Sequence, residues 1–189
     1  MRKLSVFNFV TLNGFYKGPS EDISWHQHAA AGSEESEFGK EGTQQDNIIL
    51  FGRVTYEMMK SYWPTSMANE QNPVIAEGMN KAMKIVFSKK LKNADWENAQ
   101  VINEDLVGYV KKLKQTATKD MIILGSGSIT TQLTDAGLID QYQFMIDPVA
   151  IGSGTAMFNG IKKKLDLELI GSRIFKSGIV LLTYQPLGK

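Results

Sequence analysis

Cysteine is absent from this sequence of 189 residues. Disulfide bonds, thiol catalysis and thiolate metal sites are therefore excluded. No apolar run approaches the length of a membrane-spanning helix. Residues 1–3 lead directly into a strand-like pattern, without the apolar core and cleavage site of a signal peptide. We therefore expect no association with a membrane, and a cytoplasmic location is the default expectation.

An excess of charge of either sign is also lacking. Lysine and arginine number 21 against 20 acidic residues, so the net charge is +1. This balance gives no indication of a surface that binds nucleic acid. Apolar residues make up 42% and charged residues 22%, as in ordinary soluble globular proteins. The length predicts one domain, spanning residues 1–189, with a substantial core.

Histidine is scarce, with two residues that lie close together as His26 and His28. A His-x-His pair can supply two ligands to a metal ion. The chain holds no third histidine and no cysteine, so a zinc site would need carboxylates to complete it. We expect a polar loop here and no metal site. The neighbouring Trp25 is either a core anchor or a residue that packs over the active site.

The stretch Met121–Leu133 is the most informative part of the chain. An apolar run over 121–124 predicts a buried strand, and helical spacing begins at Ile129. Gly125, Ser126, Gly127 and Ser128 lie between them. A strand, a glycine turn and a helix start bring free N–H groups and the positive end of the helix dipole together, which favours phosphate binding. The alternative is an ordinary turn that uses glycine for its backbone angles.

The glycine turn does not match a Rossmann fingerprint. The third glycine of G-x-G-x-x-G would fall at residue 130, where the sequence has Thr130. The motif also lies two-thirds of the way along the chain, without an early βαβ unit to carry it.

A similar arrangement occurs earlier, after the apolar run Asn47–Phe51. Gly52 and Arg53 follow this predicted strand, and Val54–Tyr62 has helical spacing. Arg53 is one of three arginines in the chain. A cation is poorly placed for the dipole at a helix start, which favours an anionic partner for Arg53 over an idle surface position.

The remaining pattern alternates strands and helices before becoming rich in strands. The segment Lys17–Asp46 is polar and is too long for a loop that only connects two elements. A helix is predicted within it over Ser33–Lys40, capped by Ser33. The other predicted strands are Lys3–Leu12, Lys84–Ser88, Gln100–Ile102, Gln141–Ile146, Leu165–Phe175 and Ile179–Gln185, and the other helical segments are Ala76–Lys81 and Glu104–Gln115. Residues 176–178 predict a hairpin turn. The fold class is α/β, with a mostly parallel central sheet and an antiparallel C-terminal strand.

Five motifs together resemble the dihydrofolate reductase-like superfamily, specifically the branch of the C-terminal reductase domain of the riboflavin-biosynthesis protein RibD. They are Val10-Thr11-Leu12-Asn13-Gly14, Leu50–Glu57, Val86-Phe87-Ser88, Leu124–Ser128, and Pro148-Val149 through Gly152-Ser153-Gly154 to Phe158. The resemblance spans nearly the whole chain and implies a three-layer α/β/α fold. It also implies an NADPH-dependent oxidoreductase similar to dihydrofolate reductase or 5-amino-6-(5-phosphoribosylamino)uracil reductase.

The resemblance assigns three segments to one NADPH molecule. Gly52, Arg53 and Thr55 correspond to the turn that holds phosphates, and Ser88, with Lys89 beside it, corresponds to the neighbourhood of the 2′-phosphate. The pyrophosphate turn corresponds to Gly125, Ser126, Gly127, Ser128 and Ile129. Arg53 and Lys89 give a physical reason to prefer NADPH over NADH, because a 2′-phosphate needs cationic partners.

The resemblance places the nicotinamide near Phe9 and Val10, under a loop that opens at Asn13. Many relatives have aspartate at this position. Asparagine can orient a substrate through hydrogen bonds but cannot serve as an acid or base at neutral pH. Trp25 corresponds to a tryptophan in the same loop of the family, on the substrate side.

The catalytic acid is the least defined part of the resemblance. Glu34 precedes Phe38 by four residues, as the acid of dihydrofolate reductases precedes an aromatic residue, and a solvated acidic helix start is the alternative. No arginine lies between Trp63 and Lys81 to receive the glutamate tail of folate, which argues against folate as the substrate.

Two functions are compatible with these patterns. The first is an NADPH-dependent reductase that transfers a hydride to a small pterin- or pyrimidine-like heterocycle. The second is a non-catalytic nucleotide-binding protein that retains the fold. The resemblance implies a homodimer in either case, with the strand-rich C-terminal segment as the expected contact.

Overall fold

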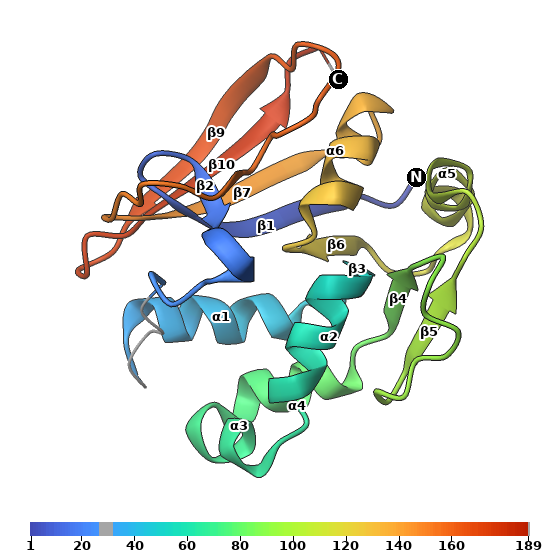
Figure 1. Ribbon diagram of the computed structural model, residues 1–189, viewed down its shortest axis with the longest axis horizontal. Helices are drawn as coiled ribbons and strands as arrows, with labels where there is room; N and C mark the ends of the chain where they lie inside the picture. Colours follow the sequence, from blue (N-terminus) through green and yellow to red (C-terminus); the bar gives the residue numbers. More distant parts are fainter. Residues whose placement is uncertain (27–31, 189) are drawn as a thin grey trace.

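The chain forms one large mixed sheet with helices on both faces (Figure 1). The structure is a computed structural model that describes residues 1–26 and 32–188. The strand order is β5-β4-β3-β6-β1-β7-β10-β9. These strands are β1 (Leu4–Thr11), β3 (Ile48–Gly52), β4 (Lys84–Phe87), β5 (Ala99–Ile102), β6 (Met121–Leu124), β7 (Gln141–Asp147), β9 (Leu167–Ile174) and β10 (Val180–Pro186). The six strands from β5 to β7 are parallel, and β10 and β9 continue the sheet antiparallel.

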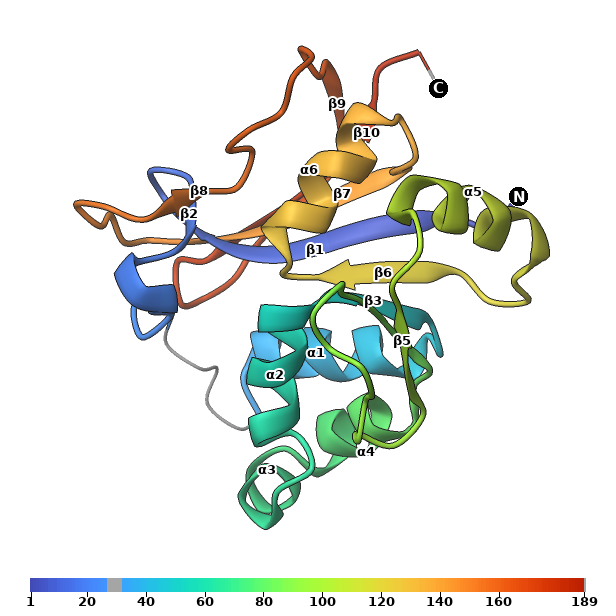
Figure 2. The same ribbon diagram turned by 45° about the vertical axis from the view of Figure 1, so that its right-hand side comes forward.

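The helices form two layers, which are separated most clearly in Figure 2. One face carries α5 (Leu106–Thr116) and α6 (Gly127–Asp135), and the other carries α1 (Glu34–Gln44), α2 (Arg53–Tyr62) and α4 (Pro73–Lys81). The alternation of strand side chains explains the two layers. In β1, Val6 and Val10 join the core under α5 and α6, while Phe7 and Phe9 face the α1 layer.

The structure confirms the predicted fold class, including the mostly parallel sheet with an antiparallel C-terminal end. Each predicted strand is present within two residues of its expected ends. Ser33 caps α1 as expected, since its hydroxyl accepts the Ser36 N–H at 3.2 Å. The hairpin between β9 and β10 turns at Gly178, whose φ of 90° is readily adopted by glycine.

Four short elements were not predicted from the sequence. They are α3 (Ser66–Gln71), β2 (Phe15–Lys17), β8 (Thr155–Ala156) and the 3₁₀ turn η1 (Pro19–Glu21). The strands β2 and β8 pair with each other as a separate two-stranded sheet. Elements of two to six residues present too few positions for an apolar period to be recognised.

No described helix is both long enough and apolar enough to cross a membrane. Within residues 1–26 and 32–188, there is also no group of three or more histidine, aspartate or glutamate side chains able to hold a metal ion.

Candidate functional site

Four neighbouring strands, β3, β6, β1 and β7, end at the same edge of the sheet, which we call the carboxyl edge. The first two lead into the glycine turns at Gly52 and Gly125, and β7 ends at Asp147. Parallel α/β sheets bind their ligands beyond the carboxyl ends of the strands. The topology therefore brings the separate sequence motifs to one place.

Two helices begin at this edge without a capping side chain. The N-cap residues are Gly52 for α2 and Ser126 for α6, and neither helix has a side-chain cap hydrogen bond or an acidic residue in its first turn. By contrast, Ser33, Thr65 and Asp105 cap the starts of α1, α3 and α5. Within the described residues, no side chain therefore caps the first N–H groups of α2 and α6, and both helix dipoles favour an anion here.

Ser126 joins the two helix starts instead of capping its own helix. Its Oγ accepts the Gly52 N–H at 2.9 Å, and its own N–H donates to Thr55 Oγ1 at 3.1 Å. Ser126 has left-handed backbone angles (φ 58°, ψ 58°), and Gly125 before it has φ 63°. Two successive residues with positive φ turn the chain sharply, and the bonds to Gly52 and Thr55 fix this turn against α2.

Gly125 and Gly127 each have a close neighbour within the protein. A Cβ on Gly125 would lie 3.0 Å from Thr55 Cγ2, and one on Gly127 would lie 2.5 Å from Tyr16 Oη. Tyr16 belongs to β2, which follows the turn at the end of β1. The absence of a side chain at Gly127 therefore allows the Tyr16 ring to approach the start of α6, a contact that the sequence pattern did not reveal.

The predicted cationic groups lie on the α2 side of the carboxyl edge. Arg53 begins α2, and its Nη1 lies 2.6 Å from Glu57 Oε2 one turn later. Ser88 follows β4, and its Oγ accepts the N–H groups of Lys90 and Leu91 at 3.1 and 2.9 Å. Lys89 is exposed beside it. Ser88 thus shapes the turn that presents Lys89.

Asn13 and Glu34 are both engaged in contacts between loops. The Asn13 amide donates to Ile151 O at 2.8 Å, and its Oδ1 accepts the Thr11 hydroxyl at 2.9 Å. Glu34 Oε1 lies 3.4 Å from Lys176 Nζ, and Oε2 accepts the Lys176 N–H at 3.4 Å. In this structure, therefore, Asn13 anchors the loop after β7, and Glu34 binds the hairpin between β9 and β10.

Glu35, next along α1, also binds this hairpin. The Ser177 hydroxyl donates a hydrogen bond to Glu35 Oε1. This hydrogen bond holds the pKa of the Glu35 carboxyl below its usual value. Two consecutive acidic residues of α1 therefore connect the helix to the hairpin.

Phe9 and Val10 face opposite sides of the sheet, although the resemblance places both beside the nicotinamide. Val10 is 6% exposed and packs in the core under α6. Phe9 lies against the His26 ring, with ring centroids 3.8 Å apart and an interplanar angle of 28°. Only one of the two side chains can therefore face a given ligand.

His26 binds a carboxylate at the end of β7. Its Nδ1 lies 3.0 and 3.2 Å from the two Asp147 oxygens, and the two side chains are 10% and 5% exposed. Trp25 Nε1 is buried with no hydrogen-bond partner among the described residues. Asp147 is not among the site residues predicted from the sequence, although its position directly after the predicted strand Gln141–Ile146 could have indicated it. His28 lies outside the described residues.

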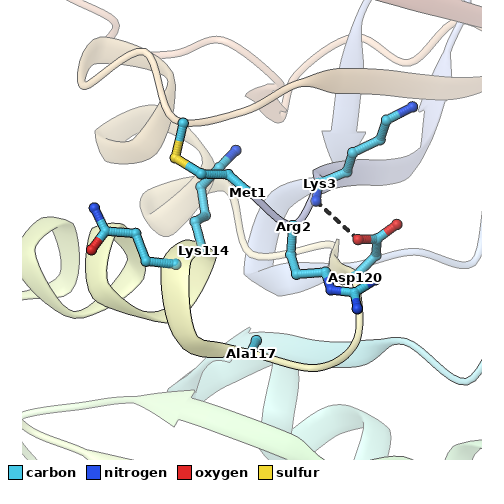
Figure 3. A pocket seen from close by; sticks show the side chains of 7 residues that line it. Met1, Arg2, Lys3, Lys114, Ala117 and Asp120 are labelled. Carbon is cyan, nitrogen blue, oxygen red and sulfur yellow. Dashed lines mark hydrogen bonds between the residues drawn. The ribbon is translucent and has the colours of Figure 1, made fainter.

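A cavity of about 380 Å³ lies at the opposite end of the strands, beside the N-terminus. Figure 3 shows Arg2, Lys3 and Lys114 around it, with the Lys3 N–H donating to Asp120 Oδ1 at 3.0 Å. These residues precede β1 and β6 or lie near the end of α5. The cavity is therefore remote from the glycine turns and is not part of the candidate site.

The family model of the RibD C-terminal domain matches residues 2–181. The chain belongs to this family. Among curated proteins, it is 28% identical over 185 residues to the uncharacterized protein YyaP of Bacillus subtilis, covering 97% of this chain and 95% of YyaP. It is 23% identical over 187 residues to YwjB of the same organism, covering 95% and 96%.

Solved structures of low sequence identity share the fold. A putative riboflavin biosynthesis protein from Shewanella sp. PV-4 has a TM-score of 0.72 at 17% identity, with 98% of this chain and 99% of that chain covered. A pyrimidine reductase-like protein from Corynebacterium diphtheriae has a TM-score of 0.66 at 13% identity, with 100% and 93% covered. A deaminase/reductase from Thermotoga maritima has a TM-score of 0.66 at 16% identity, and this chain spans 57% of it.

Proposed function

We propose that this RibD C-terminal domain protein is an NADPH-dependent reductase that transfers a hydride to a C=N or C=O bond of a small pterin- or pyrimidine-like heterocycle. The observation that carries the proposal is the pair of uncapped helix starts of α2 and α6, joined by Ser126 at the carboxyl edge. The family supports a reductase fold, and the names of the relatives from Corynebacterium and Thermotoga support the substrate class.

The residues at the carboxyl edge fit a dinucleotide. The N–H groups of Gly127, Ser128 and Ile129 open α6 and are suited to the pyrophosphate, although Ile129 N–H also reaches Ser126 O at 3.1 Å. Arg53 and Lys89 are suited to the 2′-phosphate, which would draw the Arg53 guanidinium away from Glu57. When bound, the reduced nicotinamide supplies the hydride. The chain binds and orients both reactants.

Calorimetric titration of NADPH and NADH tests the cofactor assignment. We expect NADPH to bind more tightly, because Arg53 and Lys89 offer charge to the 2′-phosphate. Equal affinities for the two cofactors would contradict it. Oxidation of NADPH against a panel of pterins and pyrimidines, followed by the loss of nicotinamide absorbance, then tests catalysis.

Inhibition by methotrexate tests whether the substrate pocket accepts folate or only smaller heterocycles. We expect weak inhibition, because no arginine lies in the segment 63–81 to pair with its glutamate carboxylate. The inhibition constant is measured in the same NADPH oxidation assay. Tight inhibition by methotrexate would overturn this interpretation of the substrate pocket.

The alternative is a nucleotide-binding protein that retains the fold without catalysis. It is favoured by the contacts of Asn13 with Ile151 and of Glu34 with Lys176, which occupy the residue expected to orient the substrate and the expected catalytic acid. Tight NADPH binding without turnover of any pterin or pyrimidine in the panel would support this alternative.

We also propose a homodimer that uses the C-terminal strands. The outermost strand β9 exposes Leu169, Ile170 and Ile174, with exposed fractions of 52%, 46% and 77%. A sheet edge with apolar side chains readily pairs with another chain. We expect sedimentation at micromolar concentration to give twice the mass of the chain. A monomeric mass at that concentration would contradict the proposal.

A further inference from the structure

The His26–Asp147 pair is a buried titratable pair that the proposed cofactor site does not use. The His26 side chain is 10% exposed and that of Asp147 is 5% exposed. Burial of two such polar groups is costly unless they are well paired. Here the carboxylate receives Nδ1 at 3.0 Å, and the ring lies flat against Phe9. The pair therefore holds the imidazole in one orientation.

This pair lies at the same carboxyl edge of the sheet as the proposed nucleotide turn. The Gly125 N–H donates to the carbonyl of Phe7 at 3.3 Å, and Phe9 follows two residues later on β1. Two residues of a strand span roughly 7 Å. Asp147 pairs with Thr11 in the parallel register of β7 with β1, so the pair lies beyond Phe9 at the carboxyl edge.

The chemistry of the pair suits a proton donor. A carboxylate that accepts the Nδ1–H fixes the tautomer and the orientation of the ring. The proton that an imidazolium can then deliver is the one on Nε2. Asp147 faces the ring from β7 and the uncharged Phe9 ring covers it from β1, while on α1 Glu34 and Glu35 bind Lys176 and Ser177.

We propose that His26, oriented by Asp147, is the general acid that protonates the ring nitrogen of a heterocyclic C=N bond during its reduction. This inference rests on the proposed reductase function. The hydride leaves C4 of the reduced nicotinamide and forms a C–H bond at the substrate carbon. The electron pair of the C=N π bond takes the Nε2 proton of His26. The substrate is reduced, the nicotinamide is oxidised, and the neutral imidazole regains a proton from water.

Trp25 fits this assignment as a substrate contact. Its Nε1–H is buried without an acceptor among the described residues, and its ring lies edge-on to His26 with centroids 6.1 Å apart. A buried donor without an acceptor is a costly arrangement. A heterocycle with a carbonyl or ring nitrogen beside His26 would provide that acceptor.

The test uses the full chain with NADPH and 6-methyl-7,8-dihydropterin, a probe that contains one reducible C=N bond. The variants are His26→Gln, Asp147→Asn and, as the matched control, His28→Gln. We expect His26→Gln to lower kcat by roughly 10²- to 10⁴-fold, the usual contribution of general acid catalysis, with unchanged NADPH affinity. Asp147→Asn should lower kcat less, because Asp147 is a positioning residue. His28→Gln should retain the parent kcat.

The pH dependence of kcat distinguishes proton donation by His26 from a purely structural role of this residue. A step that needs a general acid gives kcat an alkaline limb, and we expect the parent to show this limb and His26→Gln to lack it. A fall in kcat for His26→Gln with the alkaline limb retained would overturn the inference, as would equal losses in His26→Gln and His28→Gln.

Failure of the inference and failure of the proposed function give different results. A parent that binds NADPH and reduces the probe, with an unaffected His26→Gln variant, would overturn the role of His26 alone. A parent that binds NADPH without reducing the probe would overturn the C=N assignment. A parent that does not bind NADPH in the calorimeter would overturn the proposed function itself.

Discussion

The carboxyl edge has two halves that are built differently. In the proposed nucleotide half, at the ends of β3 and β6, the backbone forms the candidate site, with two helix starts and a turn fixed by Ser126. In the proposed substrate half, at the ends of β1 and β7, the candidate site consists of side chains, including the His26–Asp147 pair and Trp25. Backbone sites depend on local sequence, whereas side-chain sites depend on which distant segments the topology brings together.

The largest expected effect lies in the nucleotide half, at the start of α6. Gly127→Val should abolish NADPH binding, because a side chain there occupies the space next to the first N–H groups of α6. The fold should largely survive. Calorimetry and thermal melts with and without saturating NADPH provide the measurement, and a variant that melts like the parent without stabilisation by NADPH supports the site.

Tyr16 supplies the control for this prediction. A Cβ on Gly127 would lie 2.5 Å from Tyr16 Oη, so the valine also displaces that ring. Tyr16→Ala removes this clash. If the double variant Tyr16→Ala, Gly127→Val regains the parent's NADPH affinity, Gly127 is needed to leave room for the Tyr16 ring and not for the cofactor. A Gly127→Val variant with a much lower melting temperature, which NADPH still raises by as much as in the parent, would show that the glycine is needed only for the conformation of the turn.

The same difference explains what the sequence predicts. The strands of the sheet and the two glycine turns were predicted because each is encoded within one short continuous segment, as in Met121–Leu133. The pairing of His26 with Asp147 was not predicted, because 121 residues separate them and only the adjacency of β1 and β7 brings them together. Likewise, the contact of Glu34 with Lys176 depends on where α1 crosses the hairpin.

A smaller effect is expected from the charge that supplements the backbone in the nucleotide half. Arg53→Ala should weaken NADPH binding by about 1.5–3 kcal/mol, the range for hydrogen bonds to charged groups. This corresponds to roughly 10- to 150-fold in Kd. NADH affinity should change much less, because NADH lacks the 2′-phosphate. Calorimetric titration of both cofactors measures the difference.

Arg173→Ala is the matched control for Arg53→Ala. Arg173 is exposed on β9, and its guanidinium lies 4.7 Å from the centre of the Phe175 ring, away from the glycine turns. Its removal should leave both cofactor affinities unchanged. Equal losses of NADPH and NADH affinity in Arg53→Ala would show that Arg53 does not bind the 2′-phosphate.

The smallest expected effect is a dependence on pH in the substrate half, where Glu35 of α1 accepts a hydrogen bond from Ser177. This bond lowers the pKa of Glu35 in the folded protein. A lowered carboxyl pKa contributes stability that is present above the unfolded pKa of about 4.3 and is lost as pH falls through the folded pKa. Because Glu35 is only half-buried, screening by solvent reduces the contribution to about 0.2–1 kcal/mol.

Urea unfolding between pH 3 and pH 7 measures the contribution of Glu35 as the free energy of unfolding of the parent minus that of Glu35→Gln. The difference should be largest near pH 7 and shrink toward pH 3, since protonation removes the advantage of the carboxylate over the amide. Glu41→Gln, an exposed position on the same helix, should show a much flatter difference. If Glu35→Gln is equally flat, the carboxylate does not stabilise the contact between α1 and the hairpin, and the substrate half is held in place by apolar packing of Phe38 against Phe7 and Phe175.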